Sequence, residues 1–126
     1  MYNMSAIPVL FYKDKDGCPV MEWLDTLPPR AFVKGAMLID RLKESGHALR
    51  RPEVDYLREH IYELRWKLGH TNYRILYFFH GQQAVILAHG LIKKEHIPDR
   101  DIDLAVQRSV RFLSAPEIHS HMEELP

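Results

Sequence analysis

Cationic and polar side chains share one face of the segment 62–94, YELRWKLGHTNYRILYFFHGQQAVILAHGLIKK, if it forms three antiparallel strands. Two-residue turns at Gly69–His70 and Gly81–Gln82, each with glycine first, predict that arrangement. The side chains on this face are Glu63, Arg65, Lys67, Asn72, Arg74, His89 and Lys93. Guanidinium and ammonium groups bind phosphate oxygens, and histidine exchanges protons near neutral pH. The pattern therefore predicts a site that binds phosphate and can transfer a proton.

The predicted register sets Arg65 opposite Arg74, and Arg74 opposite His89. Like charges that face each other destabilise a sheet, so this row indicates an anion above it, with a polyphosphate backbone as the obvious candidate. The alternative is an ordinary charged solvent face that has no ligand. A three-residue loop in place of either turn would flip one strand and scatter the row.

Several motifs in and around this segment occur in a recognisable order. YELR (62–65), YRILYFF (73–79) and VILAHGLIKK (85–94) are followed by Pro98 and a helix that bears Ala105, and FYKDKDGCPVMEWLDTLP (11–28) precedes them. Over roughly residues 7 to 112 these motifs resemble the HigB/RelE-type toxins, in particular their phage-derived HigB-like branch. The resemblance implies a RelE-like fold and a ribosome-dependent endoribonuclease that cleaves messenger RNA and is silenced by an antitoxin, here expected to be of the helix-turn-helix type.

The resemblance also implies roles for particular residues. Arg65 and Arg74 match basic positions of the family pattern, and the pair 93–94 matches its lysines at the end of the last strand. RNA cleavage needs stabilisation of charge on the scissile phosphate, a base for the 2′-hydroxyl and an acid for the 5′-oxygen. The predicted catalytic residues are Arg65, Arg74, His89 and Lys93. The predicted RNA-binding residues are Lys67, Asn72, Lys94 and His96.

Two histidines are candidates for proton transfer. His89 lies on the row and His96 just beyond it, while the alternative for His89 is a hydrogen-bonded packing role beside the following glycine. Strand alternation places Lys94 on the other face from Lys93. The stretch from Lys94 to the next proline is about one residue shorter than in the family pattern, and Glu95 adds an acid there. The acid for the 5′-oxygen therefore stays open, with His96 as a replacement.

Apolar spacing predicts the elements that position these residues. Residues 7–12 form a strand, and a turn at 13–17 leads to a short helix that ends before Pro28–Pro29. A second helix runs from Arg30 to Gly46, and both helices lie on the apolar sheet face. Residues 47–60 are expected to be a loop, and three aspartates open a last helix after Pro98. The apolar face pairs Trp66 with Tyr73, Leu64 with Ile75 and Tyr62 with Tyr77.

The expected fold is α+β and RelE-like, with a strand, a two-helix hairpin, a three-stranded antiparallel meander and a C-terminal helix. A chain of 126 residues with 46% hydrophobic content suits one domain, 1–126, with one core. That core spans about residues 7–113, and residues 114–126 are expected to be a mobile tail.

Charge and composition narrow the function classes. Formal net charge is zero, which argues against general nucleic-acid affinity. The charge is unevenly distributed, however: residues 62–96 hold five Lys/Arg and two acidic residues, whereas residues 97–126 hold three Lys/Arg and six acidic residues. The lone Cys18 excludes an internal disulfide, and the run HSHM (119–122) is a weak metal pattern, so no metal and no cofactor are expected. No apolar run reaches the ~20 residues of a membrane span, and no signal-peptide pattern is present, which indicates a cytoplasmic protein.

Two other functions remain open. The chain is alternatively a non-catalytic phage-derived domain of the same fold that binds a helix-turn-helix antitoxin-like partner, or an RNA-binding domain without cleavage. A neighbouring gene for a helix-turn-helix protein would favour a toxin module. Toxicity on induced expression, relieved by that neighbour, is the most informative test.

Overall fold

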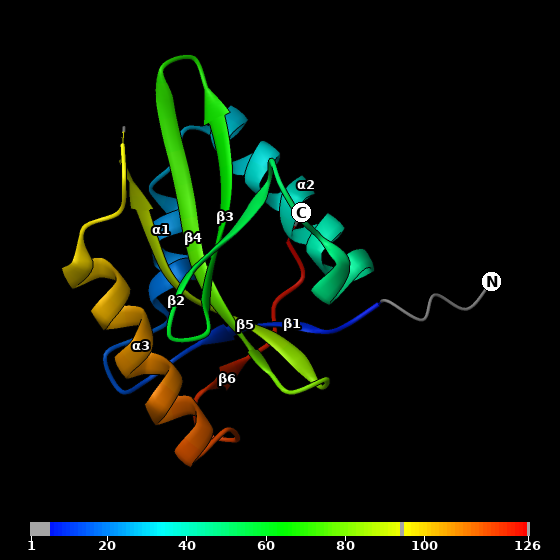
Figure 1. Ribbon diagram of the computed structural model, residues 1–126, viewed down its shortest axis with the longest axis vertical. Helices are drawn as coiled ribbons and strands as arrows, with labels where there is room; N and C mark the ends of the chain where they lie inside the picture. The colour runs from blue at the N-terminus through cyan, green and yellow to red at the C-terminus, as the bar shows by residue number, and fades with distance from the viewer. Residues whose placement is uncertain (1–5, 94, 126) are drawn as a thin grey trace.

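A six-stranded sheet in the order β2-β3-β4-β5-β1-β6 forms the centre of the computed structural model, which describes residues 6–93 and 95–125 (Figure 1). The strands are β1 (Val9–Tyr12), β2 (Val54–Arg58), β3 (Ile61–Leu68), β4 (Thr71–His80), β5 (Ala84–Ile92) and β6 (Ser120–His121). The helices are α1 (Pro19–Asp25), α2 (Pro29–Ser45), the single 3-10 turn η1 (Gly46–Ala48) and α3 (Asp99–Ser114). The mixed α+β class predicted from the sequence is confirmed.

Helices α1 and α2 cover one face of the sheet, as their apolar spacing predicts. Leu42 of α2 and Leu24 of α1 belong to the same buried cluster as Trp66 and Tyr77 of the sheet. The predicted cross-strand pairs are confirmed: Trp66 with Tyr73, Leu64 with Ile75 and Tyr62 with Tyr77. Helix α1 lies very close to β5, because a Cβ at Gly90 would fall 2.3 Å from the Trp23 ring.

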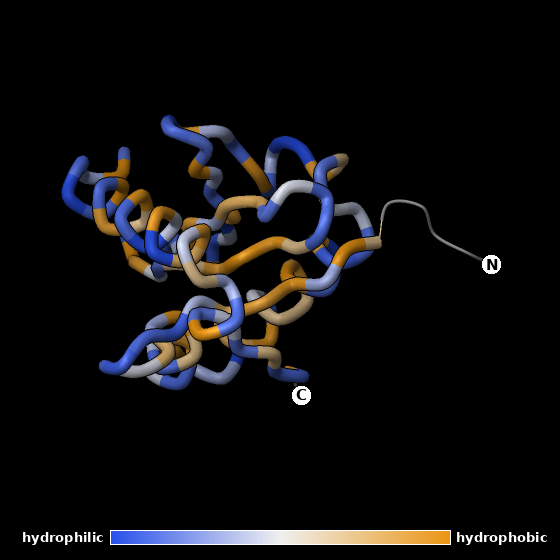
Figure 2. Tube along the Cα trace, turned by 90° about the horizontal axis from the view of Figure 1, so that it is seen from below, coloured by the Kyte–Doolittle hydropathy of each residue, from blue (hydrophilic) through white to orange (hydrophobic). Residues whose placement is uncertain are grey.

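Helix α3 covers part of the opposite face, which the alternating pattern had predicted to face solvent. Phe78 and Ile86 on that face are buried in a second cluster with Ala105 and Phe112 of α3. Strands β4 and β5 carry continuous apolar runs, typical of strands buried on both sides, so this covering follows from their composition. In Figure 2 the hydrophobic segments run through the middle of the molecule.

The β4–β5 connection differs from the prediction in a way that moves His89. The turn at Gly69–His70 is confirmed, since Leu68 pairs with Thr71, but β4 and β5 are joined by three residues, 81–83. The extra loop residue flips the first half of β5 relative to the prediction. A bulge at Ala88 adds one more residue, so the second half of β5 again presents the predicted face. The pairing register of this half is shifted by two residues from the prediction. His89 consequently faces Leu76, and Leu91 takes the expected place opposite Arg74.

Strand β2 lies in the segment 47–60, which was predicted to be a loop. It pairs antiparallel with β3, Val54 opposite Leu64 and Tyr56 opposite Tyr62. The two-residue turn between these strands has Glu59 and His60 at positive φ, 50° and 67°. Such turns usually carry glycine or asparagine, so the sequence gives little sign of the hairpin. The meander accordingly has four strands in place of the three expected.

The C-terminal segment is also more ordered than expected, because β6 pairs antiparallel with β1. Phe11 lies opposite His121, and the ring of His119 stacks on Tyr12 with its Nδ1 2.8 Å from the carbonyl oxygen of Lys13. This pairing covers the edge of β1, and the expectation of a mobile tail was wrong for these residues. Among the described helices, none is long and apolar enough to cross a membrane.

Candidate functional site

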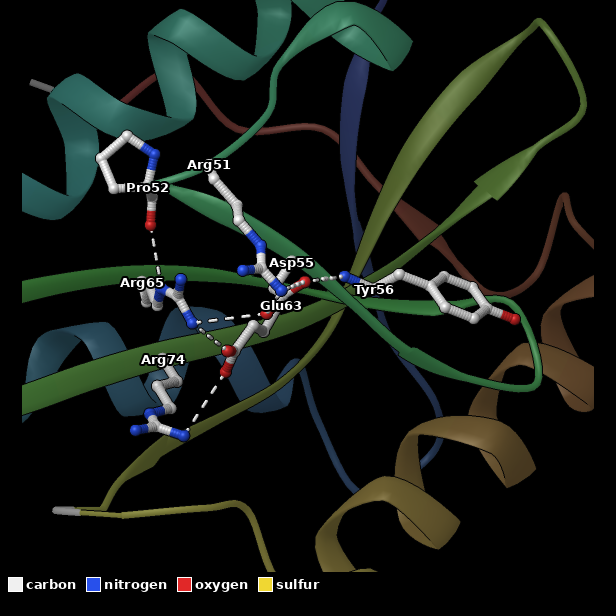
Figure 3. A network of polar contacts seen from close by, with 7 residues as sticks. All are labelled: Arg51, Pro52, Asp55, Tyr56, Glu63, Arg65 and Arg74. Atoms are coloured by element: carbon white, nitrogen blue, oxygen red, sulfur yellow. Dashed lines mark hydrogen bonds and ion pairs between the residues drawn. The ribbon is translucent and has the colours of Figure 1, made fainter.

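A buried carboxylate lies between the two arginines that the sequence predicted to face each other. Arg65 is opposite Arg74 in the β3–β4 ladder, as predicted. Glu63, only 3% exposed, places Oε1 2.9 Å from Arg65 Nη1 and Oε2 3.5 Å from Arg74 Nη1 (Figure 3). The protein therefore supplies its own anion to the pair, and the like-charge argument for an external anion no longer holds.

Further contacts fix the direction of the Arg65 side chain. Its Nε donates a hydrogen bond to the carbonyl oxygen of Pro52 at 2.8 Å, and its Nη1 lies 3.7 Å from Asp55 of β2. Arg51 binds the same Asp55 carboxylate at 3.1 Å (Figure 3). Strand β2 thus orients Arg65, a role that was not predicted for the segment 47–60.

Arg74 is held more deeply than a residue on an open sheet face. Its side chain is 12% exposed, and apart from Glu63 it forms no ion pair within the described residues. Its Nε has no hydrogen-bond partner there. The guanidinium consequently leaves its buried Nε unused by the described residues, while Glu63 holds the group in place.

A cavity of about 500 Å³ opens beside these arginines, where β3 extends past the end of β2. We call it the basic pocket, and its polar lining includes Lys34, Arg41, Arg65, Lys67, Asn72 and Arg74. Glu53 also lines it and pairs with Arg41. Lys34 donates to the carbonyl oxygen of Lys67 at 2.8 Å, and neither lysine forms an ion pair with a described residue. Cations thus outnumber acids, which suits an anionic ligand.

Two of these cations, Lys34 and Arg41, come from α2 and were not predicted. They are seven residues apart, so they project from one side of the helix, and both are exposed. That spacing was visible in the sequence. Their position beside the edge of β3 was not, because it depends on how α2 packs on the sheet.

Lys67 and Asn72, which were predicted to bind RNA, form a second row beside the arginines together with Lys93. Lys67 pairs with Asn72, and the backbone N–H of Lys93 donates to the carbonyl oxygen of Asn72 at 3.2 Å. The ladder therefore continues one residue beyond β5, and Lys93 aligns with Lys67 and Asn72. Lys94, predicted to bind RNA, lies outside the described residues.

His89 lies next to the arginine row and not within it. Since it faces Leu76, it is a diagonal neighbour of Arg74, a spacing of roughly 7–8 Å between such positions. Its Nε2 is 2.8 Å from Oδ1 of Asp101 on α3, and its Nδ1 is 3.5 Å from Nη1 of Arg108. The predicted position opposite Arg74 was wrong because of the longer loop and the bulge.

Asp101 and Arg108 are partners of His89 that sequence reasoning missed. Arg108 also donates to the carbonyl oxygen of Ala88 at 2.7 Å, and burial lowers the pKa of its guanidinium. Both residues fall on the helix face that carries Ala105 and Phe112, at spacings of three to four residues. That spacing was the available signal, because polar side chains on a buried face need partners.

His96 lies apart from the arginines. It is exposed and lines a separate cavity of about 630 Å³ together with Lys93 and Glu95. The structure therefore brings Arg65, Arg74, Lys67 and Asn72 together, sets Lys93 and His89 at their border, and leaves His96 outside. In residues 6–93 and 95–125, no three His, Cys, Asp or Glu side chains are grouped as metal ligands would be.

Comparison with known proteins places the chain in a family. The model of the family described as "Phage derived protein Gp49-like" matches residues 22–110, well over half of the chain, from α1 through most of α3. None of the curated proteins compared with the chain matches it. The chain therefore belongs to the Gp49-like family of phage-derived proteins, which is associated with toxin–antitoxin modules.

Proposed function

We propose that this protein is the toxin of a type II toxin–antitoxin module, a RelE-like, HigB-type endoribonuclease that cleaves messenger RNA on the ribosome in the cytoplasm. Its antitoxin is a helix-turn-helix protein. Membership of the Gp49-like family supports the toxin class. The observation that carries the RNA assignment is the basic pocket, where one buried carboxylate aligns Arg65 and Arg74 beside lysines that form no ion pair with a described residue.

In this proposal the basic pocket binds the phosphates that flank the cleaved bond. The Arg74 guanidinium stabilises charge on the scissile phosphate, because a planar guanidinium matches two phosphate oxygens at once. Arg65, whose side chain is one third exposed, adds a second guanidinium from β3, and its contacts with Pro52 and Asp55 hold its orientation. Lys67 and Lys93 bind neighbouring phosphates as flexible point charges. Removing any of these groups should weaken binding to RNA.

Cleavage itself would follow from attack of the 2′-oxygen on phosphorus, with loss of the 5′-oxygen bond. His89 is the proposed group that takes the 2′-hydroxyl proton, through Nδ1. The Asp101 carboxylate holds Nε2 at 2.8 Å and so fixes the ring and its tautomer. The contact of Nδ1 with Arg108 is longer, 3.5 Å, and has to open for this step. The departing 5′-oxygen takes up its proton from solvent water.

One observation favours the second candidate, a non-catalytic domain of the same fold that binds a helix-turn-helix partner. Both ring nitrogens of His89 face protein groups, and Glu63 neutralises part of the arginine charge. The two candidates differ in one measurable property. A toxin arrests growth when its expression is induced, and co-expression of the neighbouring helix-turn-helix protein restores growth. A domain that is expressed in folded form without any effect on growth would favour the second candidate.

A further inference from the structure

A second cavity, of about 530 Å³, lies on the α2 side of the sheet and plays no part in the function proposed above. We call it the aromatic pocket, and the residues used below are His47, Arg50, Tyr56, Tyr62, Tyr77 and Phe79. It is bounded by η1, β2, β3 and β4, in the region that the helices leave uncovered beyond the end of α2. Its volume lies within the range of pockets that bind small molecules.

The walls of this pocket offer aromatic surface. Tyr62 stacks on Tyr77 with ring centroids 5.6 Å apart and planes 19° from parallel, and Tyr56 meets Tyr62 edge-on at 5.0 Å. Tyr56 is 49% exposed and Tyr62 is half-buried, so both keep accessible ring surface. On the other side, His47 stacks on Phe79. Such exposed rings bind planar groups, and every nucleobase has a face that stacks on them.

The most buried residue of the pocket carries a polar group. Tyr77 is 1% exposed, and its hydroxyl forms no hydrogen bond with any residue that the structure describes. Burial raises the pKa of Tyr77 above its ordinary value, with a smaller contribution from Tyr62 and an opposing one from Arg50. The hydroxyl therefore remains protonated and can both donate and accept a hydrogen bond. A ligand with a polar edge would satisfy it.

The rim of the pocket is cationic. Arg50 donates to the carbonyl oxygen of His47, which holds its guanidinium at the mouth, and Arg51 is 75% exposed. Arg51 shares Asp55 with Arg65, as Figure 3 shows, so the segment 50–55 separates the aromatic pocket from the basic pocket. An aromatic interior with a polar floor and two arginines at its mouth matches a base joined to a phosphate.

We propose that the aromatic pocket binds one nucleotide of RNA, with the base on Tyr62, the polar edge of the base at the Tyr77 hydroxyl and the phosphate at Arg50 and Arg51. As a subsite for the messenger RNA, this assignment rests on the proposed function. As a nucleotide site, it stands on the pocket alone. It would give an RNA-cutting enzyme a means of preferring one base near the cut.

The test is a titration of the full-length protein with AMP, GMP, CMP and UMP, followed by the NMR shifts of the backbone amides of Tyr56, Tyr62 and Tyr77. Ribose 5-phosphate, which lacks a base, is the matched ligand control. At least one nucleotide should shift these amides with an affinity ten-fold or more above that of ribose 5-phosphate. Equal affinity, or no shift by any nucleotide at concentrations up to ~10 mM, would overturn the assignment.

Variants separate this site from the basic pocket. Tyr77→Phe removes only the hydroxyl oxygen, which forms no hydrogen bond with a described residue, so it should fold normally and lose roughly 3- to 10-fold in affinity for that nucleotide, the worth of one hydrogen bond. Lys67→Ala, in the basic pocket, should leave this affinity unchanged. An unchanged affinity in Tyr77→Phe contradicts the placement of the base.

Nucleotide binding without any cleavage of messenger RNA would refute the catalytic proposal alone. Cleavage without nucleotide binding, or binding of only a partner protein at these residues, would refute the nucleotide site alone.

Discussion

Arg65 and Arg74 face each other across the β3–β4 ladder, and a single buried residue, Glu63, binds both of them. This relationship explains how two guanidinium groups can lie side by side in a sheet without a ligand. It also fixes both groups in a set direction. A site whose cations are held in place loses less conformational entropy when it binds a phosphate.

The first prediction concerns the stability of this arrangement. Glu63→Gln keeps the shape of the side chain but removes the negative charge that pairs with both arginines, so the free energy of unfolding should fall by about 3 kcal/mol. Chemical denaturation measures the change. In the double variant Glu63→Gln, Arg74→Met the loss should be smaller than the sum of the single losses, because the unpaired arginine is gone. Additive losses would show that Glu63 and Arg74 do not interact.

A second prediction concerns Lys93, which aligns with Lys67 and Asn72 at the border of the basic pocket. Lys93→Ala should weaken binding to ribosomes programmed with messenger RNA by about 1 kcal/mol and reduce the salt dependence of binding. The matched control is Lys15→Ala, which removes the same charge from the exposed turn before α1. Equal effects of the two variants would place Lys93 outside the RNA surface.

The third prediction tests His89 as the proton-transfer group. His89→Gln can still accept or donate a hydrogen bond near Asp101, but it cannot titrate, so cleavage should slow by roughly 10²- to 10⁴-fold while ribosome affinity stays nearly constant. His96→Gln, in the separate cavity, is the control and should be mild. If His89→Gln cuts at the parental rate, the ring is a packing residue bound to Asp101 and the imidazole base was wrongly assigned.

Local patterns predicted the parts of the fold that depend on neighbours in sequence. The apolar pairs of β3 and β4, the turn at Gly69 and the acidic start of α3 all follow from alternation, turn chemistry and the helix dipole. The covering of the second sheet face was also readable, because the runs of β4 and β5 are apolar at every position near their middle. The expectation of an open basic face overlooked that signal.

The remaining features depend on details that short-range patterns do not encode. Nothing in the run HGQQA distinguishes a two-residue turn from the three-residue loop observed, and nothing in the sequence marks the bulge at Ala88, which is buried in the same cluster as residues of α3. Together they moved His89 by two positions. Glu63 was correctly set on the face of Arg65, but its burial between two arginines follows from β2, whose turn lacks glycine. The site therefore could be predicted in its charges and only partly in its geometry.

The most direct test of the proposed cleavage site compares the parental protein with Arg74→Lys in a reconstituted translation system. Arg74→Ala is less informative, because it would leave Glu63 partly unpaired and destabilise the fold. Lysine keeps a positive charge near Glu63, so stability should change by no more than about 1 kcal/mol, but it loses the planar fork that binds two phosphate oxygens. We expect the parental protein to cut ribosome-bound messenger RNA and folded Arg74→Lys to cut it at least ~10²-fold more slowly. Equal cleavage by both proteins, or none by the folded parental protein, would contradict this expectation.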